Sequence, residues 1–255
     1  MSTASTRFDA IADNYAKSEV HETSPSLTML RALGEGRTNL DVCDVACGAG
    51  HSAFALLGHA KAMYGVDPSP NMLRNFMALG KARGAPVHAV EGFAESIPLP
   101  DRSIDLVVCR LAAHHFIDIG RALSEFRRIV RPEGSIVIID LHGADDPDHD
   151  GLNHQLEVLH DPTHLRSYTV ARWRELLAEA NLRVESLERD LTERPGGVPL
   201  ARWCEIASSG PAAHAAMIAL LDNTAPEALA AIGVRRGEAG YTVPVRTCFI
   251  RAQVR

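Results

Sequence analysis

The sequence predicts an α/β protein built on a doubly wound, mostly parallel sheet of seven strands, with helical insertions. Two observations predict this class. From residue 39 on, short β-rich runs alternate with amphipathic helical patterns, which is typical of consecutive βα units. The chain has 255 residues, of which 46% are hydrophobic and 23% charged, so it has the composition of one globular domain with a large core.

Seven segments have the length and composition of strands. The expected ranges are 40–45, 62–66, 87–90, 104–109, 135–141, 183–188 and 243–254. Between the second and third, Ser69 is a natural N-cap with Pro70 at the first helical position. One apolar face then follows at helical spacing, formed by Met72, Leu73, Phe76 and Met77.

Two further helices are expected. Residues 117–131 have helical spacing, and Pro132 with Gly134 predicts a turn into the next strand. The other helix begins near Thr169, with an inward face made of Trp173, Leu176, Leu177 and Ala180.

Three segments do not follow the alternation of strands and helices and are candidates for caps over a substrate: 1–36, 142–164 and 194–240. We therefore expect one domain over 1–255. Its parts are an N-terminal helical cap (1–36), a core that carries the glycine loop (37–141), cap insertions with a core helix and strand (142–240), and the last strand (241–255).

Charge and cysteine content narrow the function. A net charge of −6 and a pI near 6.0 argue against nucleic acid as a partner, because proteins that bind nucleic acid usually present a clustered basic face. The five cysteines form no C-x-x-C pair, which suits reduced core thiols in a cytosol. No segment has the length of a signal peptide's apolar region or of a membrane span, so we expect a cytoplasmic protein without a span.

The stretch CDVACGAGHSA, 43–53, holds the clearest binding motif. Gly48-x-Gly50-x-x-Ala53 fits a dinucleotide fingerprint, and the loop follows the first strand, beside the expected switch point of the sheet. Asp44 discriminates between nucleotides, because a carboxylate in this turn opposes a pyrophosphate but suits the ammonium of an amino acid. S-adenosylmethionine carries such an ammonium and a positive sulfonium.

Asp67, at the end of AMYGVD, lies about 20 residues beyond the loop, where an acidic side chain can accept both ribose hydroxyls. This position suits NAD and S-adenosylmethionine equally. The alternative is that Asp67 only caps the helix that follows it.

At this point the sequence resembles the class I S-adenosylmethionine-dependent methyltransferases, within them the small-molecule group similar to the ubiquinone/menaquinone-biosynthesis C-methyltransferases. The resemblance rests on four motifs in order: DVACGAG, GVDPSPNML, GFAESIPLPDRSIDLVVCRLAAHHF and RRIVRPEGSIVIID. It implies a Rossmann-like sheet with an antiparallel last strand, methyl transfer to a small-molecule substrate, and a monomer or homodimer.

The resemblance also implies the cofactor contacts. The residues expected to bind S-adenosyl-L-methionine are Tyr15, Asp44, Ala46, Gly48, Gly50, Asp67, Pro68, Met72, Ala94, Glu95 and Arg110. The glycine loop would surround the methionine moiety and Asp67 the ribose, while Ala94 and Glu95 would lie at the adenine edge. Met72 would pack near the adenine face, Tyr15 would fold over the cofactor, and Arg110 with Leu111 would line the floor beside the sulfonium.

Two positions depart from the family pattern. Ala46 stands where glycine is most frequent, which should cost little if its backbone avoids positive φ. Phe93 stands where a polar residue that contacts adenine is frequent, and Glu95 is alternatively a surface carboxylate.

His114 and His115 follow the fourth strand and are the candidate catalytic bases, because imidazole titrates near neutral pH. At most one is expected to face the substrate, with His114 preferred; the alternative is that both only pack under the cap. CRLAAHHF lacks the Asn/Asp-Pro-Pro-aromatic turn of nucleobase amine methyltransferases.

The stretch 142–164 holds five histidines and several aspartates. Only His160 and His164 have one-turn spacing, and Pro162 interrupts that helix, so no metal site is expected. Two other function classes stay open. A protein with the S-adenosylmethionine fold but without methylation activity, acting as a regulator or binding partner, would carry a damaged first motif, whereas this motif is intact. A nicotinamide-dependent oxidoreductase would have a third loop glycine and no carboxylate at Asp44.

Overall fold

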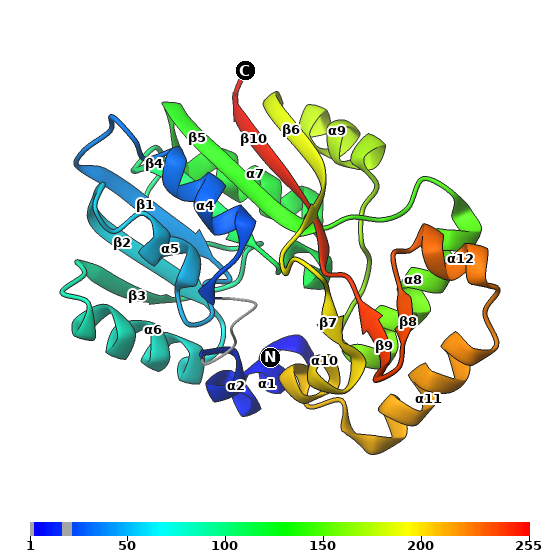
Figure 1. Ribbon diagram of the computed structural model, residues 1–255. Coiled ribbons are helices and arrows are strands. Elements are labelled where there is room, and N and C mark those ends of the chain that lie inside the picture. Colours follow the sequence, from blue (N-terminus) through cyan, green and yellow to red (C-terminus); the bar gives the residue numbers. More distant parts are fainter. Residues whose placement is uncertain (1–2, 17–21) are drawn as a thin grey trace.

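The sheet at the centre of the molecule has the strand order β3-β2-β1-β4-β5-β10-β6 in the computed structural model, which describes residues 3–16 and 22–255 (Figure 1). The strands are β1 (Leu40–Val45), β2 (Ala60–Asp67), β3 (Val87–Glu91), β4 (Ile104–Arg110), β5 (Val130–Leu141), β6 (Leu182–Thr192) and β10 (Arg246–Val254). β10 runs antiparallel to β5 and β6, and the other neighbouring strands of this sheet pair in parallel. The predicted seven-stranded, mostly parallel sheet with an antiparallel last strand is confirmed.

Helices cover both faces of the sheet because its strands are apolar on both sides. On β1, Cys43 and Val45 pack into one cluster with α7 (Ile119–Ile129) and α9 (Val170–Glu179). The alternate residue Val42 packs on the other face, under α4 (Pro25–Ala32) and α5 (His51–Ala55). The third expected helix is confirmed, since Thr169 caps α9 and its predicted inward residues are buried.

The second predicted helix and its exit differ in detail. A 3₁₀ turn (Ala113–His115) precedes α7, and β5 begins at Val130 instead of after a turn at Pro132 and Gly134. In the pairing with β4, Ile104 lies opposite Val130 and Leu106 opposite Ser135, so extra residues are accommodated as a register shift. The expected turn is therefore an irregular strand.

A cap with its own apolar cluster lies beyond the carboxyl ends of the strands, at the right of Figure 1. It contains α8 (Pro147–His160), α10 (Leu200–Ala207), α11 (Gly210–Asp222) and α12 (Pro226–Ala231). A small sheet of order β7-β9-β8 joins them, with β7 (Val198–Pro199), β8 (Arg235–Gly237) and β9 (Gly240–Val243). The expected last strand from residue 243 is thus two strands, because Pro244 separates β9 from β10.

The N-terminal helices α1 (Thr3–Ala10) and α2 (Ala12–Ala16) lie between α6 (Pro70–Ala82) and α10, at the bottom of Figure 1. Asp9 ties α1 to the start of α6 by accepting hydrogen bonds from Ser69 Oγ (2.7 Å) and Asn71 N (2.9 Å). On the other side, Arg7 forms an ion pair of 3.0 Å with Asp161. These contacts hold α1 over the carboxyl ends of the strands.

Candidate functional site

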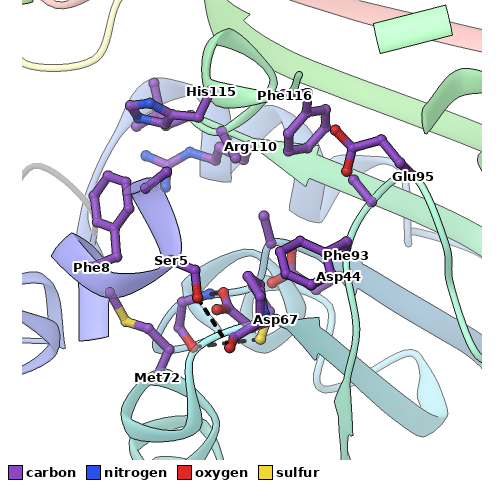
Figure 2. Close-up of a pocket in the computed structure, with 18 of the residues that line it drawn as sticks. Ser5, Phe8, Asp44, Asp67, Met72, Phe93, Glu95, Arg110, His115 and Phe116 are labelled. Carbon is purple, nitrogen blue, oxygen red and sulfur yellow. Dashed lines mark hydrogen bonds between the residues drawn. The ribbon is translucent and has the colours of Figure 1, made fainter. Parts of the chain in front are cut away.

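A cavity of about 510 Å³ opens at the switch point, where β1 and β4 are neighbours and their chains continue to opposite sides. Its size is typical of small-molecule sites. The predicted residues that line it are Asp44, Ala46, Gly48, Asp67, Pro68, Met72, Ala94, Glu95, Arg110 and His115. Figure 2 shows several of these side chains around one space.

One of the predicted cofactor residues, Gly50, does not line this cavity. Gly50 sits behind it, at the N-cap of α5 with φ of 91°, where a Cβ would lie 2.3 Å from the Phe76 ring. Its role is therefore to shape the turn. Tyr15 belongs to α2, and its side chain lies outside the described residues.

The loop also contains a non-glycine residue in the left-handed region. Ala46 has φ of 53°, beside Gly48 with φ of 52°. The condition under which Ala46 was expected to cost little, a backbone that avoids positive φ, is therefore not met. A Cβ in this region meets the neighbouring carbonyl, which costs of order 1 kcal/mol. The strain is stored in the loop that forms the floor of the cavity.

Ala46→Gly is expected to raise the free energy of unfolding by about 0.5–1 kcal/mol, because glycine removes the steric cost of positive φ. Chemical denaturation of both proteins measures the difference. Ala49→Gly is the matched control, since Ala49 is in the same loop without positive φ and should give no gain. A less stable Ala46→Gly protein would show that the Cβ contributes more by packing than it costs in strain.

Asp44 is a buried carboxylate at the inner end of the cavity. It is 2% exposed and accepts one hydrogen bond, from Ala53 N at 3.1 Å. Burial raises its pKa to about 8, although that hydrogen bond and the positive charge of Arg110 oppose the rise. Within the described residues Asp44 forms no ion pair, so its ionised form lacks a close cation.

Asp67 connects the glycine loop with the following helix. Its carboxylate accepts from Gly48 N and Ser69 N, both at 2.9 Å. The N-cap of α6 itself is Ser69, whose hydroxyl accepts from Met72 N at 3.1 Å. Burial raises the pKa of Asp67 to about 6. The carboxylate therefore orders the loop and the capping residue of α6 without being the cap itself, and it also lines the cavity.

At the opposite wall, Glu95 holds the turn after β4. Its carboxylate accepts from Ile117 N at 3.0 Å and from Asp118 N at 3.3 Å. Phe93 lines the same wall and is 41% exposed. The carboxylate of Glu95 is thus occupied with backbone groups, and it lies beside Phe116 in Figure 2.

Arg110 is fixed by a buried network that the sequence did not reveal. Its guanidinium forms an ion pair of 3.1 Å with Glu193 from the region after β6. Ser26 accepts from Arg110 Nε at 3.0 Å and donates to Glu193 at 2.7 Å. Thr247 also donates to Glu193, at 2.7 Å. A charged side chain is thereby held in the floor of the cavity.

His114 is oriented by a carboxylate that the sequence analysis missed. Asp140, at the end of β5, accepts from His114 N at 2.7 Å and lies 2.6 Å from its Nδ1. Burial disfavours the charged imidazole, but Asp140 with Glu157 and Asp161 outweighs it, so the pKa of His114 is raised. The sequence did offer one signal for this contact. Asp140 is an acidic residue at the end of an expected strand, and the histidines follow the strand before it in the chain.

His115 has the opposite electrostatics. Its Nδ1 lies 3.0 Å from Thr163 O, and burial, with the charge of His114, lowers its pKa to about 4. His115 lines the large cavity in Figure 2, whereas His114 does not. Both imidazoles line a second, smaller cavity beneath the cap. The two bases therefore share only that smaller cavity.

The His-rich stretch does not assemble a metal centre. Across residues 3–16 and 22–255, no group of three or more His, Cys, Asp or Glu side chains is arranged to hold a metal ion. All five cysteines are buried and free, as expected of core thiols. No helix in the described part of the chain is long and apolar enough to cross a membrane.

Comparison with known proteins places this site in a family. The sequence model described as "Methyltransferase domain" matches residues 43–138. The protein YafE of Escherichia coli is 34% identical over 142 residues, which cover 55% of this chain and 69% of YafE. The chain belongs to the methyltransferase domain family. The matched range contains the glycine loop, Asp67 and both candidate histidines.

Other methyltransferases of this family are similar over different lengths. The uncharacterized methyltransferase YcgJ of Bacillus subtilis is 29% identical, with 80% of this chain and 84% of YcgJ covered. Its crystal structure superimposes with a TM-score of 0.80 at 24% identity, over 90% of this chain and 98% of YcgJ, which shows the same fold. The demethylmenaquinone methyltransferase of Chlorobaculum tepidum is 34% identical, over 42% of this chain and 43% of that enzyme.

Proposed function

We propose that this methyltransferase uses S-adenosyl-L-methionine to methylate a small-molecule acceptor by in-line displacement. The observation that carries the proposal is Asp44, a buried carboxylate without an ion-pair partner among the described residues, at the inner end of a cavity at the switch point. An ammonium group would supply the missing positive charge, and the amino acid end of this cofactor carries one.

The residues present fit the rest of the cofactor. Asp67 would accept the ribose hydroxyls, with Pro68 beside it, and Met72 would pack on the adenine. Ala94 and Glu95 would lie at the adenine edge, where the family pattern places them. When bound, S-adenosylmethionine supplies an electrophilic methyl group on a sulfonium. The protein then has to orient the acceptor, exclude water and take a proton where the acceptor must lose one.

The two histidines would have different roles. The imidazole of His114 is held by Asp140, which favours its protonated form, so it is suited to take a proton from the acceptor. His115 stays neutral at physiological pH and lines both cavities. It would position the acceptor at the boundary between them. His115 is the alternative base if His114 proves to be structural.

Asp67→Ala is expected to weaken binding of S-adenosylhomocysteine and of adenosine alike, by about 1.5–3 kcal/mol, because both ligands carry the ribose. Calorimetric titration with each ligand measures the loss. Asp101→Ala is a matched control, since Asp101 is exposed and absent from the cavity lining, and should leave both affinities unchanged. Unchanged affinities in Asp67→Ala would mean that Asp67 only orders the loop and the start of α6.

A further inference from the structure

The smaller cavity has a volume of about 70 Å³ and lies where the cap meets the end of the sheet. A single water needs about 10–15 Å³ on this scale, so the cavity holds a group of about five heavy atoms. Its polar walls come from the core histidines, from α8 of the cap, which is behind β8 and β9 in Figure 1, and from Asp161 and His164 just after α8. It is therefore enclosed by residues from two parts of the fold.

The two cavities share a wall. Phe8, Leu111 and His115 line both of them. If the larger cavity holds the cofactor, a ligand in the smaller one lies next to it, at the boundary that these three side chains line. The smaller cavity is therefore in a position to hold the group that receives the methyl.

Two buried imidazole nitrogens around this cavity lack hydrogen-bond partners, and a carboxylate in the same lining forms no bond to the described residues. Glu157, 8% exposed, forms no side-chain hydrogen bond or ion pair within the described residues. His160 Nδ1 and His164 Nε2 are buried without a partner. Buried polar groups in folded proteins are nearly always satisfied. A bound ligand with hydrogen-bonding atoms would satisfy them.

The charge around the cavity favours a cation. No Lys or Arg side chain belongs to its lining among the described residues. The nearest guanidinium, Arg7, is already bound to Asp161 at 3.0 Å and to Ala207 O at 2.6 Å. Asp140 is already engaged by His114, whose Nδ1 lies 2.6 Å from it. Glu157 is then the carboxylate without a counter-ion in this lining.

Burial raises the pKa of Glu157 to about 7, so a bound cation would favour its ionised form. The other three imidazoles of the lining do not repel a cation. Burial lowers the pKa of His160 to about 3 and that of His164 to about 2, and His115 is also neutral. The ring of His160 stacks on Trp203 at 3.8 Å, and Trp203 itself lines the cavity. Aromatic walls beside an unpaired carboxylate are a suitable environment for an ammonium group.

We propose that the smaller cavity binds the amino group of a small primary or secondary aliphatic amine as its ammonium ion, paired with Glu157, and that this amine is the methyl acceptor. The proposal rests on the function proposed above. The ammonium first gives one proton to the neutral imidazole of His114. The nitrogen lone pair then forms the N–C bond, the C–S bond breaks, and its electron pair stays on sulfur. The product is a methylated ammonium that pairs again with Glu157.

The test uses n-propylamine and its uncharged isostere propan-1-ol, titrated calorimetrically in phosphate buffer into the protein saturated with S-adenosylhomocysteine. We expect the amine to bind at least about 30-fold more tightly than the alcohol, which is the usual scale of a buried charge pair. Glu157→Gln should remove this preference and leave the affinity for the alcohol within about threefold. Glu227→Gln, an exposed position on α12, should keep the preference.

The outcomes separate the two proposals. If S-adenosylhomocysteine does not saturate the protein, the proposed function fails. If it does, and the alcohol binds as tightly as the amine or Glu157→Gln keeps the preference, only the amine proposal is overturned. With S-adenosylmethionine present, mass spectrometry should detect N-methylpropylamine. Methylation of the alcohol in place of the amine would also overturn it.

Discussion

Asp44→Asn is expected to weaken binding of S-adenosylhomocysteine by about 100-fold or more while making the ligand-free protein more stable. Removing one partner of a buried charge pair costs about 3 kcal/mol, which gives the loss of affinity. Asparagine keeps an oxygen for the hydrogen bond from Ala53 N and removes the buried charge. Calorimetry and chemical denaturation measure the two effects. Adenosine is the control ligand, since it has no ammonium and should lose little.

Ionisation of Asp44 makes both the stability of the free protein and its affinity for an ammonium ligand depend on pH in a definite direction. In the free protein burial raises the pKa of Asp44 to about 8, above its value near 3.8 in the unfolded chain. The buried charge therefore lowers stability as pH rises from about 4 towards 8. An ammonium ligand needs the ionised form, so its dissociation constant should rise by up to about tenfold as pH falls from 7.5 to 6.5. Asp44→Asn should abolish this dependence.

If Asp44→Asn leaves both the affinity and its pH dependence unchanged, Asp44 does not hold the ammonium. A substituted protein that is less stable than the wild type would assign the carboxylate a structural role instead.

His114→Gln is expected to lower the rate of methyl transfer by a factor of about 100 to 10,000, the usual contribution of a general base. Affinity for S-adenosylhomocysteine should stay within about threefold, because His114 does not line the larger cavity. Glutamine can still donate a hydrogen bond to Asp140 but cannot take up a proton. Formation of S-adenosylhomocysteine with the best acceptor from a panel of small amines, alcohols and carbon acids measures the rate.

Three further variants test how the loss of rate in His114→Gln arises. Asp140→Asn should also reduce the rate, and the double variant should be little worse than either single one, because both residues act as one unit. His88→Gln, on the exposed side of β3, is the control for a histidine outside the site. Equal losses of rate and cofactor affinity in His114→Gln would mark it as a structural residue, and His115 would then be tested as the base.

The sequence was sufficient to predict the core because each βα unit carries its own local signals. β1 agrees with the expected range, and the caps at Ser69 and Thr169 are where residue type predicted them. Strand ends were less accurate, because neighbours in the sheet extended β2, β5 and β6 beyond their apolar runs. The sheet β7-β9-β8 was missed, since strands of two to four residues have no recognisable periodicity.

The site was predictable where one loop carries the chemistry. Asp44, Gly48 and Asp67 are close in sequence to the strands that present them, and all three line one cavity. Asp140 and Glu157 were missed because their importance comes from long-range packing: one meets His114 across the sheet and the other arrives from the cap. The positive φ of Ala46 has no signal in residue type, since alanine rarely adopts it.

Binding of S-adenosylhomocysteine and of NADH to the purified wild-type protein, measured by calorimetric titration, tests the central claim most directly. The two ligands share a ribose that Asp67 can bind, but only one brings an ammonium to Asp44, and the other brings a pyrophosphate. We predict binding of S-adenosylhomocysteine with a dissociation constant on the order of micromolar and no binding of NADH. Binding of NADH without binding of S-adenosylhomocysteine would contradict the account and favour a nicotinamide enzyme.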